Sequence, residues 1–157
     1  MATPPRTLPA GEYWFEDLQE GDRYETGGIV VTESHIVSYA GLSGDLFDVH
    51  MDDDFARAQG FPGRIAHGLL GLALTDGLKN RSAVRIQAIA SLGWSWKFRA
   101  PILAGDRIAA TVTVAGTRLS SKGQGIVTLA ISVSKQDGSV VQDGETTLLT
   151  RRRPAAA

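Results

Sequence analysis

The feature that most constrains this chain is a short segment, 67–78, that is apolar on almost every side. After His67-Gly68 it consists largely of leucine and alanine: Leu69, Leu70, Leu72, Ala73, Leu74 and Leu78. A helix with so little polar face is normally surrounded by other structure. A membrane-spanning helix needs about 20 apolar residues, and this segment is shorter than that. We therefore expect the rest of the chain to cover this helix with protein.

The second half of the chain changes to the period of two that is typical of β-strands. Apolar and polar residues alternate over four segments: 86–98, 107–114, 127–133 and 140–150. The first of these predicts a long, half-buried strand. Gly105-Asp106 and Asp137-Gly138 are turn signals between the segments, and 120–125 is a flexible connection. These late strands predict an antiparallel meander.

Upstream of the apolar segment, the sequence predicts one strand and two helices. The strand covers 23–32, where β-branched residues occur. Thr32 is expected to cap a helix that ends near Gly44, and 52–59 predicts a short helix. One short strand, several helices and about four long antiparallel strands define an α+β class. We expect a single domain in which the sheet wraps around the central apolar helix.

The length of the chain, 157 residues, suits one domain with a real core and is short for two. We expect a flexible N-terminal arm over 1–12, where three of the first ten residues are proline. The domain is expected over 13–150. The remaining segment, 151–157, begins with three arginines and is expected to be a solvated C-terminal tail.

Charge and cysteine content exclude several classes of function. The formal net charge is -1, so the chain lacks the basic balance that is usual in nucleic-acid binders. It contains no cysteine, which excludes disulfides and thiolate chemistry and permits a reducing compartment. The first ten residues have no long apolar stretch of the kind found in signal peptides and membrane anchors. We therefore expect a cytoplasmic protein that binds neither nucleic acid nor membrane.

Three residues point to chemistry: Asp45 and His50 on a loop upstream of the apolar segment, and Gly68 at its start. A carboxylate and an imidazole five residues apart on an irregular segment can both point at one water and exchange protons near neutral pH. Gly68 begins the apolar helix, where its N–H and the helix dipole would favour negative charge on a substrate oxygen. The spacing alone also fits a capping acid beside a surface histidine. Both interpretations stay open on these residues.

A wider pattern surrounds these three residues. The signature positions, in register, are Tyr39, Leu42, Ser43, Gly44, Asp45, Val49, His50 and Ala56. The segment 63–68 follows with the sequence GRIAHG. Together they resemble the MaoC-like, (R)-specific enoyl-CoA hydratase family, over nearly the whole chain. The resemblance implies a hot-dog fold, Asp45 and His50 as a catalytic pair, and the Gly68 N–H as donor to the thioester oxygen.

The chain departs from that family at Phe47 and Asp48, which stand where the signature has Asn-Pro. The ring of Phe47 is expected to fill space beside the catalytic pair and to contact substrate. Asp48 either repels Asp45, if both are buried, or faces solvent. A further departure is Asp76, where relatives often have a small hydroxyl residue. It lies about two helical turns beyond Gly68, so we expect it on the same face and in contact with substrate.

His67 is expected either to be a structural residue of the turn before Gly68 or to contact substrate. The three histidines and Asp45 show no metal-ligand spacing, so no metal is expected. The sequence has no glycine-rich phosphate loop. No cofactor is expected beyond the CoA thioester that the resemblance implies as substrate.

Three functions remain open. The resemblance implies first a hydro-lyase that reversibly hydrates a 2-enoyl-CoA thioester to the 3-hydroxyacyl-CoA, with acyl-CoA as its small-molecule partner. A hot-dog acyl-CoA thioesterase would use a similar oxyanion site but attack the carbonyl carbon. A non-catalytic acyl-thioester-binding module is the third, because Phe47 and Asp48 replace Asn-Pro. The exposed edges of the sheet predict a homodimer or a dimer of dimers, although the pattern does not exclude a monomer.

Overall fold

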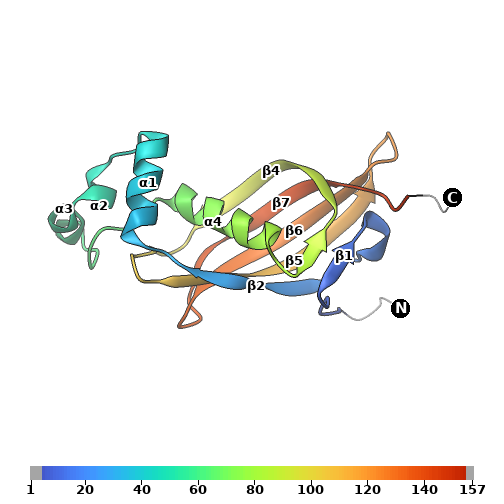
Figure 1. Cartoon of the computed structure of the whole chain (residues 1–157), viewed down its shortest axis with the longest axis horizontal. Helices are drawn as coiled ribbons and strands as arrows, with labels where there is room; N and C mark the ends of the chain where they lie inside the picture. Colours follow the sequence, from blue (N-terminus) through green and yellow to red (C-terminus); the bar gives the residue numbers. More distant parts are fainter. Residues whose placement is uncertain (1–4, 155–157) are drawn as a thin grey trace.

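The computed structural model describes residues 5–154 of the chain (Figure 1). The helices are the 3-10 helix η1 (Phe15–Asp17) and the α-helices α1 (Glu33–Ser43), α2 (Asp48–Met51), α3 (Asp53–Ala58) and α4 (Gly68–Asn80). The strands are β1 (Gly11–Tyr13), β2 (Arg23–Val30), β3 (Val84–Ile86), β4 (Ala88–Phe98), β5 (Arg107–Leu119), β6 (Gly125–Lys135) and β7 (Val140–Thr150). Within 5–154, no helix is long and apolar enough to cross a membrane.

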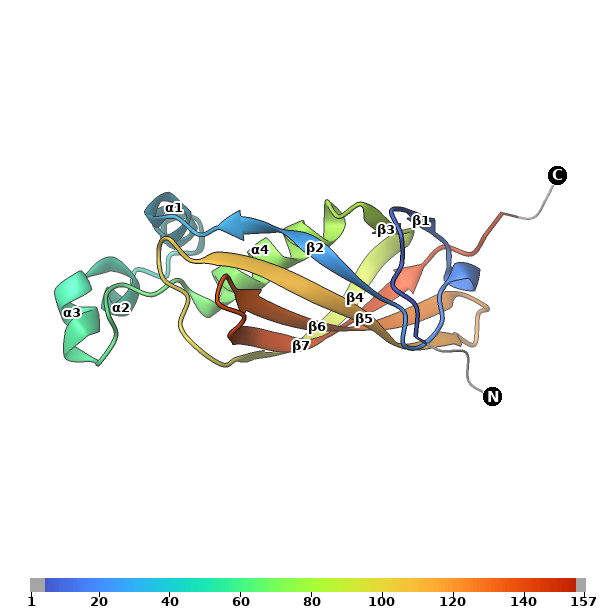
Figure 2. The same cartoon turned by 90° about the horizontal axis from the view of Figure 1, so that it is seen from below.

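The core lies between α4 and one face of a five-stranded antiparallel sheet, as Figure 1 and Figure 2 show. The strands are ordered β2-β5-β6-β7-β4. Alternate residues of the central strands, such as Val112 on β5 and Leu129 on β6, point into the core. Leu70 and Leu78 of α4 belong to the same buried cluster. The predicted α+β class, with the sheet packed on the apolar helix, is therefore confirmed.

The helix ends before the site follow the predicted capping chemistry. The Thr32 hydroxyl accepts a hydrogen bond from the His35 N–H and starts α1. Gly44 ends α1 with a φ of 79°, a left-handed conformation that favours glycine. The Asp52 carboxylate caps α3. The loop that carries Asp45 therefore begins immediately after a fixed helix end.

The strand predicted over 86–98 is wrong in both its continuity and its burial. The structure divides it into β3, which pairs in parallel with β1, and β4, which pairs with β7. Strands β5, β6 and β7 form the meander. Within the five-stranded sheet β4 pairs with β7 alone, so it forms an edge. Most of β4 is exposed, with Ile89 55% and Leu92 56% accessible, since an edge strand has protein on only one side.

The expectation that α4 is covered on all sides is also wrong for the described chain. The sheet covers the side of α4 that carries Leu70 and Leu78, whereas Leu69 and Ala73 face outward. Helices α1, α2 and α3 lie beyond one end of the sheet (Figure 1). They therefore meet the N-terminal end of α4 and leave much of its outer side open.

The N-terminal arm, expected to be flexible over 1–12, is packed in its described part. The Leu8 side chain is 5% exposed and its N–H donates to the carbonyl of Arg23. Arg6 forms a salt bridge of 2.5 Å with the buried carboxylate of Asp22. An apolar anchor and an ion pair therefore fix this segment. Residues 1–4 lie outside the described part of the chain.

The C-terminal tail, expected to be solvated, is held where the structure describes it. Arg152 donates to the Glu16 carboxylate at 2.8 Å, and Arg153 forms an ion pair with Asp17. Both acids belong to η1, which is distant from these arginines along the chain. The pairing therefore could not be predicted from the sequence. Residues 155–157 lie outside the described part.

Candidate active site

His50 lies on α2 with its ring orientation fixed by a backbone carbonyl. Its Nδ1 is 2.8 Å from the carbonyl oxygen of Ile65. A carbonyl only accepts, so Nδ1 carries the hydrogen and the Nε2 of a neutral ring keeps its lone pair. The His50 side chain is 12% exposed. It is therefore shielded and held with one basic nitrogen free of this contact.

Asp45 lies on the loop between α1 and α2 and faces that free nitrogen. Its Oδ2 is 4.0 Å from the Nε2 of His50. This distance is too long for a direct hydrogen bond, but an oxygen beside both atoms would lie within hydrogen-bond reach of each. The loop is shaped by two short contacts, since Ser43 accepts from the Asp45 N–H and Asp45 accepts from the Phe47 N–H. The two residues paired in the sequence analysis are thus brought together.

His67 completes the cluster from the residue that precedes α4. It is 2% exposed, and its Nε2 lies 2.9 Å from the carbonyl oxygen of Asp45, to which it donates. Its ring stacks on that of His50, with centroids 3.8 Å apart and planes inclined by 26°. The Tyr39 ring also lies against the His67 ring, with centroids 4.9 Å apart and planes inclined by 57°. His67 therefore contacts both members of the pair: it donates a hydrogen bond to the backbone of Asp45 and stacks on the ring of His50.

The three side chains of Asp45, His50 and His67 each offer a ligand atom, and these atoms lie within 4.8 Å of one another. A zinc site needs donor lone pairs that converge on one point about 2.0–2.1 Å from each nitrogen. The two imidazoles are stacked, so their in-plane lone pairs do not converge well. One nitrogen of each ring is also engaged with a carbonyl. This geometry fits a metal poorly, and the absence of a metal stays a prediction.

Gly68 opens α4 beside the same cluster. The first N–H groups of a helix have no partner within it, and the Gly68 N–H finds no acceptor among residues 5–154. A Cβ at this position would lie 2.7 Å from ring atoms of Phe98, so only glycine fits here without movement. Gly68 and His50 line one cavity of about 300 Å³, together with Phe98, Gln142 and mostly apolar neighbours. A helix N-terminus and a free imidazole nitrogen are thus positioned around one space.

Phe47 and Asp48, the departures from the signature, both lie on the outside. Phe47 is 58% exposed, and its ring meets those of His50 and Phe55 edge-on, at 6.3 Å and 5.8 Å between centroids. Asp48 is exposed at the start of α2. Of the two alternatives for Asp48, the structure therefore has the one in which it faces solvent.

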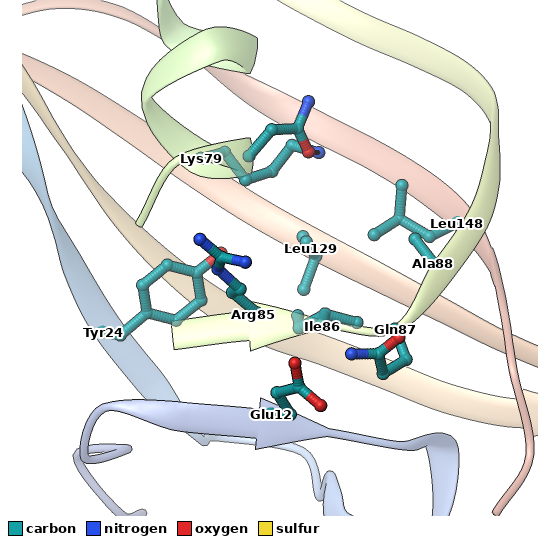
Figure 3. A pocket seen from close by; sticks show the side chains of 10 residues that line it. Glu12, Tyr24, Lys79, Arg85, Ile86, Gln87, Ala88, Leu129 and Leu148 are labelled. Atoms are coloured by element: carbon teal, nitrogen blue, oxygen red, sulfur yellow. Dashed lines mark hydrogen bonds between the residues drawn. The ribbon is translucent and has the colours of Figure 1, made fainter. Parts of the chain in front are cut away.

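Asp76 is not brought into the cavity that contains His50 and Gly68. Eight residues of helix place it about 12 Å along the axis from Gly68. Its carboxylate pairs instead with Lys79, at 3.1 Å. Lys79, which is largely buried, belongs to a second cavity of about 160 Å³ at the opposite end of α4 (Figure 3). Asp76 therefore lies nearer to that second cavity than to the Asp45–His50 pair.

The second cavity combines charged and apolar side chains. Lys79, Arg85 and Glu12 contribute the charges, and Leu129 and Leu148 contribute apolar side chains (Figure 3). Burial raises the pKa of the Tyr24 hydroxyl at its wall, because the phenolate would be desolvated. None of Asp45, His50 and Gly68 lines this space.

Comparison with known proteins identifies the family of this chain. The family model described as MaoC like domain matches residues 17–136. The (R)-specific enoyl-CoA hydratase of Rhodospirillum rubrum is 34% identical over 141 residues, which cover 90% of this chain and 94% of the relative. The crystal structure of the MaoC-like dehydratase from Rhodospirillum rubrum has a TM-score of 0.80 at 30% identity, covering 90% of this chain and 99% of that one.

A protein of lower sequence identity shares the same fold. A Mycobacterium tuberculosis protein described as having a double hot-dog fold matches with a TM-score of 0.81 at 19% identity, over 96% of this chain and 47% of that one. At this identity the likeness shows the fold alone, and that fold is the hot-dog. With the family model covering most of its length, the chain belongs to the MaoC-like dehydratase family.

Proposed function

We propose that this protein is a hydro-lyase that reversibly adds water to a 2-enoyl-CoA thioester, giving the 3-hydroxyacyl-CoA. The observation that carries this proposal is the free Nε2 of His50, 4.0 Å from the Asp45 carboxylate and beside the cavity that Gly68 lines. Hydration of a conjugated thioester needs a base for water and a donor for the thioester oxygen. The site offers both kinds of group.

In the proposed reaction, His50 Nε2 takes a proton from water while Asp45 accepts the water's other hydrogen bond. The resulting hydroxide adds to C3, and the electrons of the double bond move onto the thioester oxygen. The Gly68 N–H and the N-terminus of α4 stabilise that negative charge. The His50 imidazolium then returns its proton to C2. Water is thereby added across the double bond, and the base is regenerated.

The substrate class is supported by the relatives. The Rhodospirillum rubrum relative is named an (R)-specific enoyl-CoA hydratase, and the lining of the cavity is mostly apolar. An apolar space beside a helix N-terminus suits an acyl chain whose thioester oxygen must be held. We therefore expect the acyl group to enter the cavity that Gly68 and Phe98 both line.

The experiment that tests this function uses crotonyl-CoA, followed by branched and longer enoyl-CoAs. Loss of the conjugated thioester absorbance without release of free CoA supports the hydro-lyase. Release of free CoA thiol supports the thioesterase instead. Binding without either change would identify a non-catalytic acyl-thioester-binding module.

We also propose that the protein forms a homodimer through β4. The outer edge of β4 has no partner strand among residues 5–154, and Ile89 and Leu92 on this strand are exposed. Leu69 adds a further exposed leucine from α4. Pairing of two β4 edges would satisfy the free backbone groups and cover these side chains.

A further inference from the structure

A buried glutamine connects Gly68 to the sheet. Gln142 lies on β7, which pairs with both β6 and β4, and it is 2% exposed. Its Oε1 accepts a hydrogen bond from the Trp96 indole at 3.0 Å, and its Nε2 donates to the Gly68 carbonyl at 3.0 Å. An indole N–H only donates and a carbonyl only accepts, so both partners require the same orientation of the amide.

Two glycines on one face of α4 make room for this connection. Gly68 and Gly71 are three residues apart, and residues so spaced are neighbours on a helix surface. A Cβ on Gly71 would collide with the side-chain amide of Gln142, while one on Gly68 would meet Phe98. The missing side chains therefore allow β4 and β7 to hold the first turn of α4 directly.

The hydrogen bond from Gln142 restrains the backbone at Gly68, the proposed oxyanion donor of the reaction. Glycine has more backbone freedom than any other residue, and the first turn of a helix lacks hydrogen bonds on its N–H groups. A donor for a developing oxyanion is effective only when it is oriented before the reaction. Gln142 fixes the backbone on the C-terminal side of Gly68, within the cavity that both residues share with His50.

We propose that Gln142 is a positioning residue that holds the Gly68 N–H toward the His50 cavity, and that Trp96 holds Gln142 in turn. This proposal rests on the hydration function, because it concerns the oxyanion donor of that reaction. It adds two residues from the sheet, Gln142 and Trp96, to a site whose proposed catalytic groups, Asp45, His50 and Gly68, lie on helices and a loop.

Two variants and one control test the proposal. Gln142→Met removes both hydrogen bonds at similar volume, whereas Gln142→Glu keeps an acceptor for Trp96 and loses the donor to Gly68. Gln124→Met, on the exposed β5–β6 connection, is the control. We expect kcat per folded protein to fall about 10- to 100-fold in both Gln142 variants, with KM changed less than about twofold. Activity within about twofold of the wild type in both would overturn the proposal.

An NMR measurement separates this proposal from the proposed function. The backbone order parameter of Gly68 should fall from a rigid value near 0.85 toward about 0.6 in Gln142→Met, and remain high in the control. Trp96→Phe, which removes the indole donor and keeps a smaller aromatic ring, should give a smaller decrease and serves if Gln142→Met does not fold. An unchanged order parameter overturns the positioning role whatever the activity. If the wild type hydrates no enoyl-CoA while Gly68 loosens in the variant, the function fails and the restraint stands.

Discussion

His67 stacks on His50, with the ring centroids 3.8 Å apart. The same His67 ring donates through Nε2 to the carbonyl of Asp45, so one buried side chain contacts both members of the proposed catalytic pair. The geometry of the pair therefore depends on His67. In the described structure, His67 makes no hydrogen bond to the Nε2 of His50 or to the carboxylate of Asp45.

Substitution of His67 should separate these two contacts. His67→Phe keeps a ring that can stack and loses the donor to Asp45, and it should lower kcat up to about tenfold, the worth of one hydrogen bond. His67→Ala loses both contacts, so kcat and the melting temperature should both fall further. Steady-state kinetics and thermal unfolding of the two variants check this. Equal kcat in His67→Ala and the wild type would contradict the positioning role.

Removal of either member of the proposed catalytic pair should abolish most of the hydration activity. His50→Ala and Asp45→Asn are each expected to lower kcat/KM about 10²–10⁴-fold, the usual effect of losing one general acid–base group. Asp48→Asn is the matched control, because it removes a nearby carboxylate that faces solvent. It should retain activity. Rates like those of the wild type in either of the first two variants would end the catalytic assignment.

Phe47 should influence which acyl groups are accepted, because its exposed ring meets the edge of His50. Phe47→Ala is expected to change the ranking of short, long and branched enoyl-CoAs, and Phe47→Asn to shift it toward straight chains. A hydrophobic pocket distinguishes a methylene by about 10- to 200-fold, so we expect a change of that order in relative kcat/KM. An unchanged ranking with a lower melting temperature would show that Phe47 only packs against Phe55.

Acid should weaken the attachment of the C-terminal segment. The pKa of Glu16 is lowered from 4.5 to about 2, mainly by the hydrogen bond from the Arg152 guanidinium and secondly by the one from the Arg153 N–H. A carboxyl group whose pKa is lower in the folded state than in the unfolded state stabilises the protein at pH values above the unfolded-state pKa. This stabilisation is lost as the pH falls from about 4.5 to about 2. Arg152→Gln should therefore be less stable than the wild type at neutral pH, and the difference should narrow over that window. Urea unfolding at several pH values measures it; Arg57→Gln, within α3, is the control. A difference that does not depend on pH would contradict this role for Glu16.

The proposed dimer makes a separate prediction about β4. Leu92→Glu places a charge on the exposed edge strand and should shift sedimentation from dimer toward monomer at micromolar concentration. Val140→Glu, at an exposed position at the start of β7, is the control and should leave the dimer intact. A wild-type protein that sediments only as monomer would exclude the assembly.

Local chemistry made much of the fold predictable. The ends of α1 and α3 depend on residues within one turn, Thr32, Gly44 and Asp52, so the sequence reveals them directly. The alternation that predicts a strand does not say where in a sheet it lies. That is why the exposure of β4 was missed. Helix α2 was missed because four residues are too few to show a helical period.

The candidate site was predictable only in part. Asp45, His50 and Gly68 lie in one stretch with a recognisable order, and the structure brings them to one place. The stacking of His67 on His50 depends on how the loop returns to α4, which spacing does not reveal. Gln142 lies 74 residues from Gly68 along the chain. Its only sequence signal was the pair of glycines at 68 and 71, which left space on an otherwise leucine-rich helix.

Strand β4 carries both Phe98, whose ring lies against Gly68, and Trp96, which holds Gln142. These contacts belong to the same strand whose outer edge has no partner strand within residues 5–154. We therefore expect a change at this edge to reach Gly68, the proposed oxyanion donor, over the width of a single strand. If two copies join there, dilution should do more than separate them: the specific activity of the enzyme should decrease as the protein concentration falls through the dissociation constant of the dimer.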